Sequence, residues 1–161
     1  MTLSPEFEAS ADTLIARYPA SKQSAVLPLL HLWQETFGYV SDGGIQWIAK
    51  KLELECIQVL ELATFYPMLK NEPMGKIHIK VCRTLSCALA GSKDLYDSFK
   101  RLLALSGDGE KPLTTPDGKF TLEFVECLAC CDKAPVVLVN EELHENMNNQ
   151  RAETLIKGYK K

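Results

Sequence analysis

The chain has 161 residues, of which 46% are hydrophobic and 24% are charged. This length fits one mid-sized domain or two small ones, and the composition is typical of a folded globular protein. A net charge of −3 provides no basic field for a phosphate backbone, so nucleic acid is not an expected partner. No stretch approaches the roughly 20 apolar residues that span a bilayer, and the N-terminus has no secretion signal. We therefore expect a cytoplasmic chain without direct membrane insertion, in which thiols stay reduced.

The first 72 residues have a helical pattern interrupted by turn residues. Ser4 followed by Pro5 predicts the start of a first helix, which must end near Pro19. A second helix is predicted from Ser21 to a terminating Gly38, and further helices are predicted after the turn at 41–44 and over about 55–66. We interpret residues 1–72 as a helical bundle.

The remaining residues, 73–161, predict a small layer of strands and helices. Apolar residues alternate strictly over 76–81 and again from 120 to 124, which is typical of strands with one buried face. The apolar run 136–139 predicts a third strand, with a short edge strand near residue 143. Helices are predicted over 91–105 and 149–159, with an open loop between 106 and 118. The chain as a whole is expected to be an α+β or α/β protein.

Four cysteines directly follow the first two predicted strands. Cys82 and Cys87 form a C-x4-C pair after the first strand, and Cys127 and Cys131 form a C-x3-C pair after the second. If the two strands are parallel neighbours, both pairs leave the same end of the sheet. Four thiolates favour an iron–sulfur cluster or zinc.

The spacing favours iron–sulfur over zinc, although it leaves the fourth ligand open. Structural zinc sites usually have tight C-x2-C pairs, whereas C-x4-C begins the plant-type ferredoxin spacing. Cys127 and Cys130 would form a C-x2-C pair, so a zinc-stabilised adaptor is the alternative. A thiol redox protein is a third hypothesis, but Cys82 and Cys87 are too far apart for the usual C-x-x-C site.

For most of the other candidate residues, the sequence favours a structural role over a functional one. A Rieske centre needs two histidine ligands, and the three histidines do not flank the cysteines; His78 is predicted on the outward face of its strand. Cys56 is interpreted as a small buried apolar residue. Arg83 and Lys133 could tune a cluster or be solvated loop residues, and the sequence favours neither. Helical spacing favours a core position for most of the bundle aromatics, which are Trp33, Phe37, Trp47, Phe65 and Tyr66.

Four separated segments resemble one family, the NuoE-type subunit of respiratory NADH:quinone oxidoreductase (complex I). Residues 126–135 (ECLACCDKAP) resemble the family's ECLGACDxAP, and residues 81–87 (VCRTLSC) resemble its VCxxxxC. Residues 24–31 (SAVLPLLH) and 62–66 (LATFY) resemble its SALLPLLH and VATFY. The chain departs from the pattern at Ala129, where the family has glycine, and between the cysteine pairs, where its loop is longer.

The resemblance implies a fold, a cofactor and a partner. The expected fold is an N-terminal helical bundle followed by a thioredoxin-like ferredoxin domain. The implied cofactor is a [2Fe–2S] cluster, and the alignment makes Cys131, not Cys130, its fourth ligand beside Cys82, Cys87 and Cys127. The implied partners are a flavin (FMN)-bearing, NADH-oxidising subunit, on which the bundle docks, and further subunits of a complex at the inner membrane. NAD-linked hydrogenases and formate dehydrogenases use the same module. No substrate site is expected in this chain itself.

Overall fold

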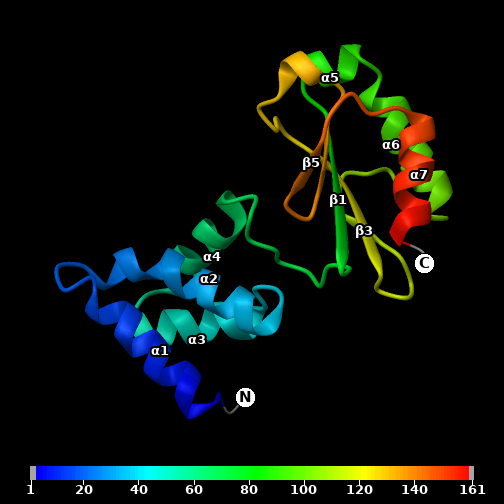
Figure 1. Cartoon of the computed structure of the whole chain (residues 1–161). Helices are drawn as coiled ribbons and strands as arrows, with labels where there is room; N and C mark the ends of the chain where they lie inside the picture. The colour runs from blue at the N-terminus through cyan, green and yellow to red at the C-terminus, as the bar shows by residue number, and fades with distance from the viewer. Residues whose placement is uncertain (1–2, 160–161) are drawn as a thin grey trace. The chain divides into compact units, whose positions relative to one another are not determined.

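The computed structural model describes residues 3–159, which form two compact units that divide between Pro73 and Met74. The first unit contains only helices, drawn from blue to green in Figure 1. The second contains a five-stranded sheet with helices. The predicted α+β class is confirmed by these elements. None of the helices within 3–159 is long and apolar enough to cross a membrane.

The helical unit comprises four α-helices and a 3₁₀ turn: α1 (Pro5–Ala16), η1 (Lys22–Ala25), α2 (Val26–Phe37), α3 (Asp42–Leu52) and α4 (Cys56–Phe65). The predicted helix starts at Ser4 and Ser41 and the predicted helix end at Gly38 are confirmed. The Ser4 hydroxyl accepts the N–H of Phe7 at 3.2 Å, which caps α1. Ser41 caps α3 in the same way, and Gly38 ends α2 with a positive φ of 87°.

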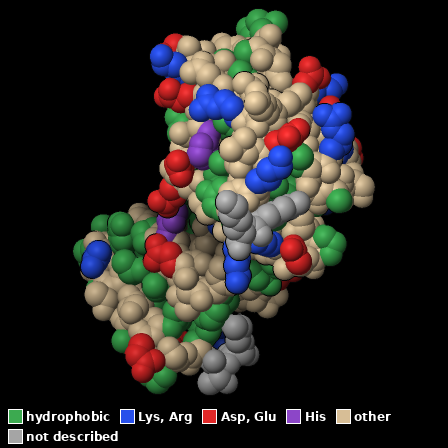
Figure 2. All heavy atoms as spheres, turned by 45° about the vertical axis from the view of Figure 1, so that its right-hand side comes forward, with side chains coloured by type: hydrophobic (Ala, Val, Ile, Leu, Met, Phe, Trp, Pro, Cys, Tyr) green, Lys and Arg blue, Asp and Glu red, His purple; other side chains and the backbone are tan. Residues whose placement is uncertain are grey.

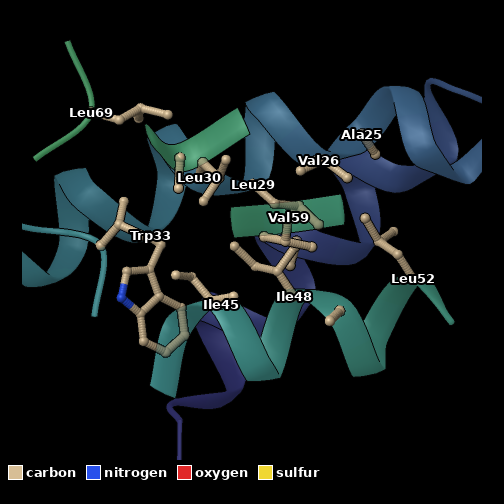
Figure 3. Packing of buried hydrophobic residues seen from close by; sticks show 14 of the residues in the cluster. Ala25, Val26, Leu29, Leu30, Trp33, Ile45, Ile48, Leu52, Val59 and Leu69 are labelled. Atoms are coloured by element: carbon tan, nitrogen blue, oxygen red, sulfur yellow. The ribbon is translucent and has the colours of Figure 1, made fainter. Parts of the chain in front are cut away.

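The core of this unit lies between α2, α3 and α4, whose apolar side chains point toward one another in Figure 3. Trp33 is buried at its centre and forms an aromatic cluster with Phe7, Phe37 and Trp47, in which ring centroids are 4.5 to 5.7 Å apart. Only glycine fits at position 44, because a Cβ there would lie 2.5 Å from the Trp33 ring. The predicted core position is confirmed for Trp33, and Phe37 and Trp47 pack against the core while partly buried.

One sequence interpretation in the helical unit is wrong, and one aromatic residue is an exception to the predicted core positions. Cys56 is exposed, since it occupies the first position of α4 and points away from the core. Phe65 is also exposed, whereas its neighbour Tyr66 packs partly against the core. Both residues have helical spacing, but neither lies on the side of α4 that carries the buried residues Val59 and Ala63.

The second unit is built on a mixed sheet of order β2-β3-β1-β4-β5. Its elements are β1 (Ile77–Cys82), α5 (Leu85–Leu89), α6 (Ser92–Leu102), β2 (Leu113–Thr114), β3 (Phe120–Val125), η2 (Cys131–Lys133), β4 (Val137–Val139), β5 (Glu142–His144) and α7 (Asn149–Tyr159). β1 and β3 are parallel neighbours, which meets the condition that the sequence set for bringing the cysteine pairs together, while the other pairings are antiparallel.

Helices α6 and α7 cover one face of the sheet, as Figure 1 shows. Alternation explains this, because every second residue of β1 and β3 faces the helices and forms one core with them. Tyr96 of α6 stacks on Phe124 of β3 with centroids 4.7 Å apart. On the surface seen in Figure 2, acidic and basic side chains are interspersed over the described residues.

His78 lies on the face of β1 opposite the helix-covered core, as predicted, but this face is not open to solvent at His78. Its side chain is only 5% exposed, and its Nε2 lies 2.8 Å from Glu123 Oε2 on the neighbouring strand. Its backbone N–H and carbonyl are both bound by Asn140, at the turn between β4 and β5. Because β1 is the central strand, side chains and turns of its neighbours cover even its polar face.

Candidate metal centre

The first cysteine pair is formed where β1 passes into α5. Cys82 is the last residue of β1, and its N–H donates to the carbonyl of Val136 at 3.2 Å. Thr84 then begins the short helix α5, which contains Cys87. Both cysteines are buried and pack together in a small apolar cluster with Val136, where each thiol influences the pKa of the other. The chain therefore turns back so that this pair meets.

Several donors point at these two sulfurs. The Thr84 hydroxyl lies 3.3 Å from Cys82 Sγ. Backbone N–H groups of Leu128 and Val136 hydrogen-bond to Cys82 and Cys87 respectively. Such donors stabilise negative charge on sulfur and are one of the means by which proteins tune iron–sulfur centres. The site is therefore suited to bound thiolates.

Burial and hydrogen bonding shift the pKa values of the two thiols in opposite directions. Burial raises the pKa of Cys82, but hydrogen bonds from Thr84 and Leu128 outweigh burial and lower it below its ordinary value. Burial raises the pKa of Cys87 to about 11. The charge of the Cys82 thiolate contributes to that rise, and so does the charge of Cys131. Ionisation is therefore less favourable at Cys87 than at Cys82.

The second pair lies on the loop after β3. Because β1 and β3 are parallel, this loop leaves the sheet at the same end as α5, at the top of Figure 1. Cys127 and Cys131 are exposed. The Ala129 N–H donates to Cys127 Sγ at 3.3 Å, and Ala129 adopts a left-handed conformation with a φ of 57°. Cys131 begins the turn η2.

An ion pair joins the two loops at their base. Arg83 follows Cys82, Glu126 precedes Cys127, and Arg83 Nε donates to Glu126 Oε1 at 2.8 Å. The sequence left the role of Arg83 open, and the structure gives it this partner. Lys133 lies 3.9 Å from Asp132 on the surface. Exposed pairs of this kind add little stability, so the Arg83 pair links the segments after β1 and β3 only weakly.

The structure brings together some of the predicted site residues and not others. Cys82 and Cys87 are in contact, and Cys131 is near enough for its charge to act on Cys87. Cys127 is hydrogen-bonded within its own loop. Within residues 3–159, no three His, Cys, Asp or Glu side chains are placed to hold a single metal ion.

Cys130 differs from its neighbours in its surroundings. Its Sγ lies 3.9 Å from Glu145 Oε1 and 4.0 Å from Asp132 Oδ1. Burial and these two carboxylates raise the pKa of the Cys130 thiol. A thiolate is therefore less favoured at Cys130 than in water.

Sequence reasoning missed the hydrogen-bond donors that surround the sulfurs of Cys82 and Cys87. Leu128 and Val136 act through backbone N–H groups, which no side-chain pattern reveals. Thr84 could have been found, because a hydroxyl two residues after a predicted ligand is within reach of its sulfur.

The fold and the site together define a class of protein. A mixed sheet covered by α6 and α7 carries two cysteine pairs at the end of parallel strands, with N–H donors aimed at sulfur, and this is the donor set of an iron–sulfur ferredoxin. The sequence profile of a family described as thioredoxin-like [2Fe-2S] ferredoxin matches residues 11–160. The chain belongs to this family, whose cofactor is a [2Fe–2S] cluster, and the thiol set fits that group.

Curated relatives match most of the chain. The E-type subunit of NADH-quinone oxidoreductase from Rickettsia typhi is 41% identical over 151 residues, which cover 92% of this chain and 86% of the relative. An E-type subunit of the same enzyme from Rhizobium meliloti is 38% identical over 160 residues, covering 99% of this chain and 90% of the relative. The family resemblance found in the sequence is thereby confirmed.

Solved structures confirm the fold. The NAD⁺-reducing [NiFe]-hydrogenase in its H₂-reduced state matches with a TM-score of 0.66 at 17% identity. The match covers 82% of this chain but 22% of the hydrogenase chain. The air-oxidised state gives a TM-score of 0.67 with the same coverage. This chain thus corresponds to about a fifth of that longer chain.

Proposed function

We propose that this chain is the [2Fe–2S] electron-transfer subunit of an NADH dehydrogenase module, and that Cys82, Cys87, Cys127 and Cys131 hold its cluster. The observation that carries the proposal is the inner pair, in which Cys82 and Cys87 are buried in contact at the end of β1 with backbone donors on their sulfurs. Cys127 and Cys131, the outer pair, follow the parallel strand β3 and therefore lie at the same end of the sheet.

The chain's own residues would have three tasks toward the cluster. The inner pair and Val136 exclude water from one side. The N–H groups of Leu128 and Val136 favour negative charge on sulfur. The exposed outer pair leaves the other side open to a partner. When bound, a plant-type [2Fe–2S] cluster exchanges one electron at a low potential, near about −400 mV.

The exchange partner that we propose is a flavin-bearing, NADH-oxidising subunit. The relatives in Rickettsia typhi and Rhizobium meliloti are subunits of NADH-quinone oxidoreductase, at 41% and 38% identity. Leu85 and Leu89 of α5 are exposed beside Cys87, which supports the close approach of an apolar protein surface. We place the chain in the cytoplasm, at the inner membrane only through its complex. The hydrogenase likeness, at 17% identity, supports only the fold.

The proposal is tested by reducing the chain with NADH through its partner. Anaerobically purified chain is mixed with the flavin-bearing subunit and NADH, and its visible absorption is followed. We expect bleaching that requires both NADH and the flavin-bearing subunit, and an EPR signal of a reduced cluster. Reduction by dithionite without any reduction by NADH and the subunit would contradict the proposed partner.

The same sample separates the remaining hypotheses. A zinc-stabilised adaptor would be colourless and would contain zinc without a redox response. A thiol redox protein would contain no metal and would have a titratable dithiol. A brown protein with iron and sulfide excludes both.

A further inference from the structure

Thr84 stands at the start of α5 but does not cap this helix with its side chain. Threonine is a favoured N-cap residue, because its hydroxyl can accept a backbone N–H of the first helical turn. Thr84 has the extended backbone of an N-cap, with a φ of −74° and a ψ of 166°, yet its side chain makes no such bond. Its Oγ1 lies instead 3.3 Å from Cys82 Sγ. The hydroxyl is therefore directed at a proposed ligand and not at its own helix.

The direction of this hydrogen bond depends on the state of the sulfur. In a free thiol, either the sulfur or the hydroxyl can be the donor. A sulfur that binds iron is a thiolate, which has no proton and can only accept. The Thr84 hydroxyl then donates to Cys82 Sγ. A hydrogen bond to a charged acceptor is stronger than one between two neutral groups.

Cys82 receives more donors than Cys87. Backbone N–H groups of Leu128 and Thr84 also hydrogen-bond to Cys82, whereas Val136 provides the backbone donor at Cys87. Within residues 3–159, no second side-chain hydroxyl lies within hydrogen-bond distance of either sulfur. A backbone donor is present whatever side chain its residue carries. The Thr84 hydroxyl is thus the donor on Cys82 that a change of side chain can remove.

The surroundings of this hydrogen bond keep it effective. Cys82 is 1% exposed and packs against Val136, and Thr84 is half-buried, so water competes little for the sulfur. A hydrogen bond is electrostatically stronger where water is excluded. The neighbouring cation, Arg83, is exposed and donates to Glu126 at 2.8 Å, so the paired carboxylate offsets its charge. The Thr84 hydroxyl is therefore a local source of positive potential at Cys82.

We propose that Thr84 is a positioning residue that acts through Cys82 and raises the reduction potential of the iron–sulfur centre. Reduction takes one electron from the reduced flavin of the partner, or from dithionite in vitro, and part of the added charge resides on the ligand sulfurs. A donated hydrogen bond stabilises this larger charge more than the smaller charge before reduction. No proton is transferred, because Thr84 Oγ1 keeps its hydrogen in both states. This proposal rests on the proposed function and adds a side chain that adjusts the potential.

The test is a redox titration of the full cluster-bearing chain, with soluble mediators and with EPR detection of the reduced form. Thr84→Val removes the hydroxyl but keeps the branched shape, so it should lower the midpoint potential. We expect the equilibrium constant for reduction to fall about threefold to tenfold, which corresponds to roughly 30 to 60 mV for one electron. Thr84→Ser keeps the donor and should remain close to the wild type.

The matched control is Ser86→Ala, which removes the other hydroxyl between the two cysteines. Ser86 is exposed on α5, and its removal should leave the midpoint potential unchanged. A second readout is electron–nuclear double resonance of the reduced chain in D₂O. Thr84→Val should lack one exchangeable deuteron that couples to the unpaired spin in the wild type and in Thr84→Ser. Thr84→Ala gives an independent removal of the hydroxyl and should lower the midpoint potential as well.

A wild-type midpoint potential in Thr84→Val or Thr84→Ala would overturn the proposal, and so would equal shifts in Thr84→Val and Thr84→Ser. If only one of the Val and Ala variants holds a cluster, the midpoint of that variant decides. Failure of both to hold a cluster would make Thr84 a residue required for assembly, which also contradicts the proposal. Mediators replace the partner in this titration, so these outcomes do not depend on the flavin-bearing subunit. A wild-type chain without a reducible cluster would instead overturn the proposed function.

Discussion

The two cysteine pairs differ in how the fold holds them. Cys82 and Cys87 are buried, in contact, and bound by donors from three different segments of the chain. Cys127 and Cys131 are exposed on an irregular loop, where Cys127 is bound by its own neighbour. The difference teaches that the sheet pre-forms half of the site and that the other half depends on a short loop after β3.

This asymmetry suits an electron carrier. A cluster with one side in the protein and one side at the surface is protected from water, yet it lies within reach of a partner's redox group. The inner pair would govern the properties of the cluster, and the outer pair would govern access to it. The following substitutions test the inner pair, the outer pair and the strand β3 that leads to the outer pair.

The largest effect is expected at the outer pair. Cys131→Ser should abolish the cluster, because serine replaces a proposed ligand, whereas Cys130→Ser should leave the visible absorption and iron content unchanged. Cys130 is the matched control because it is the adjacent thiol, with its sulfur near Glu145 and Asp132. Equal loss of absorption in both variants would show that the ligand assignment is wrong.

The next effect concerns the burial of the inner pair. Val136 is 1% exposed and packs against Cys82 and Cys87. Val136→Ala should cost about 2 kcal/mol in the free energy of unfolding, through lost apolar burial and a small cavity. Leu128 of the outer loop is half-buried and packs against the same small group of apolar side chains. Leu128→Ala should therefore cost less free energy of unfolding. Urea denaturation under anaerobic conditions measures both values, and the reverse order would contradict the inner and outer distinction.

A pH-dependent effect is expected beneath the outer loop, where Tyr96 supports β3 through Phe124. Burial raises the pKa of Tyr96, and the charges of Asp97, Asp108 and Glu123 raise it further. The unfolded chain therefore loses this proton first, so stability that is complete below about pH 10 is lost as the pH rises above it.

Tyr96→Phe should remove this alkaline loss. The Tyr96 hydroxyl is buried with no hydrogen-bond partner among the described residues, so its removal should also raise stability at pH 7, by up to about 1 kcal/mol. Urea midpoints at pH 7 and pH 10.5 measure both effects. A variant that is less stable than the wild type at both pH values would indicate a partner for the hydroxyl.

The smallest effect is expected within the outer loop itself. Ala129 has a φ of 57°, which costs a residue with a side chain roughly 1 kcal/mol or more. Ala129→Gly should relieve that cost but lose part of the gain to the greater freedom of the unfolded chain, leaving roughly 0.5 kcal/mol of stabilisation. The thermal midpoint of the cluster-bearing chain measures it. Clear destabilisation would show that the Ala129 methyl group makes a favourable contact.

Much of the fold could be predicted because its signals are local. Alternation marked β1 and β3, Ser4 and Ser41 marked helix starts, and Gly38 marked a helix end. The short elements β2 and α5 were not predicted, since two and five residues are too few for a period to be recognised.

The departures from prediction have a common cause in tertiary structure. Cys56 and Phe65 have helical spacing, but spacing cannot tell which sides of α4 its neighbours cover. His78 is buried by Glu123 and Asn140, which come from distant segments. The ligand cysteines were predictable as a set from their spacing and family resemblance, whereas the inner and outer division depends on where the loops lie in the fold.

The central claim is that this chain binds a two-iron cluster that carries one electron. The most direct measurement is iron and sulfide analysis of the anaerobically purified chain together with EPR spin counting after reduction. The account predicts two irons, two sulfides and one unpaired spin per chain. One zinc per chain without sulfide, or iron with no spin on reduction, would contradict it.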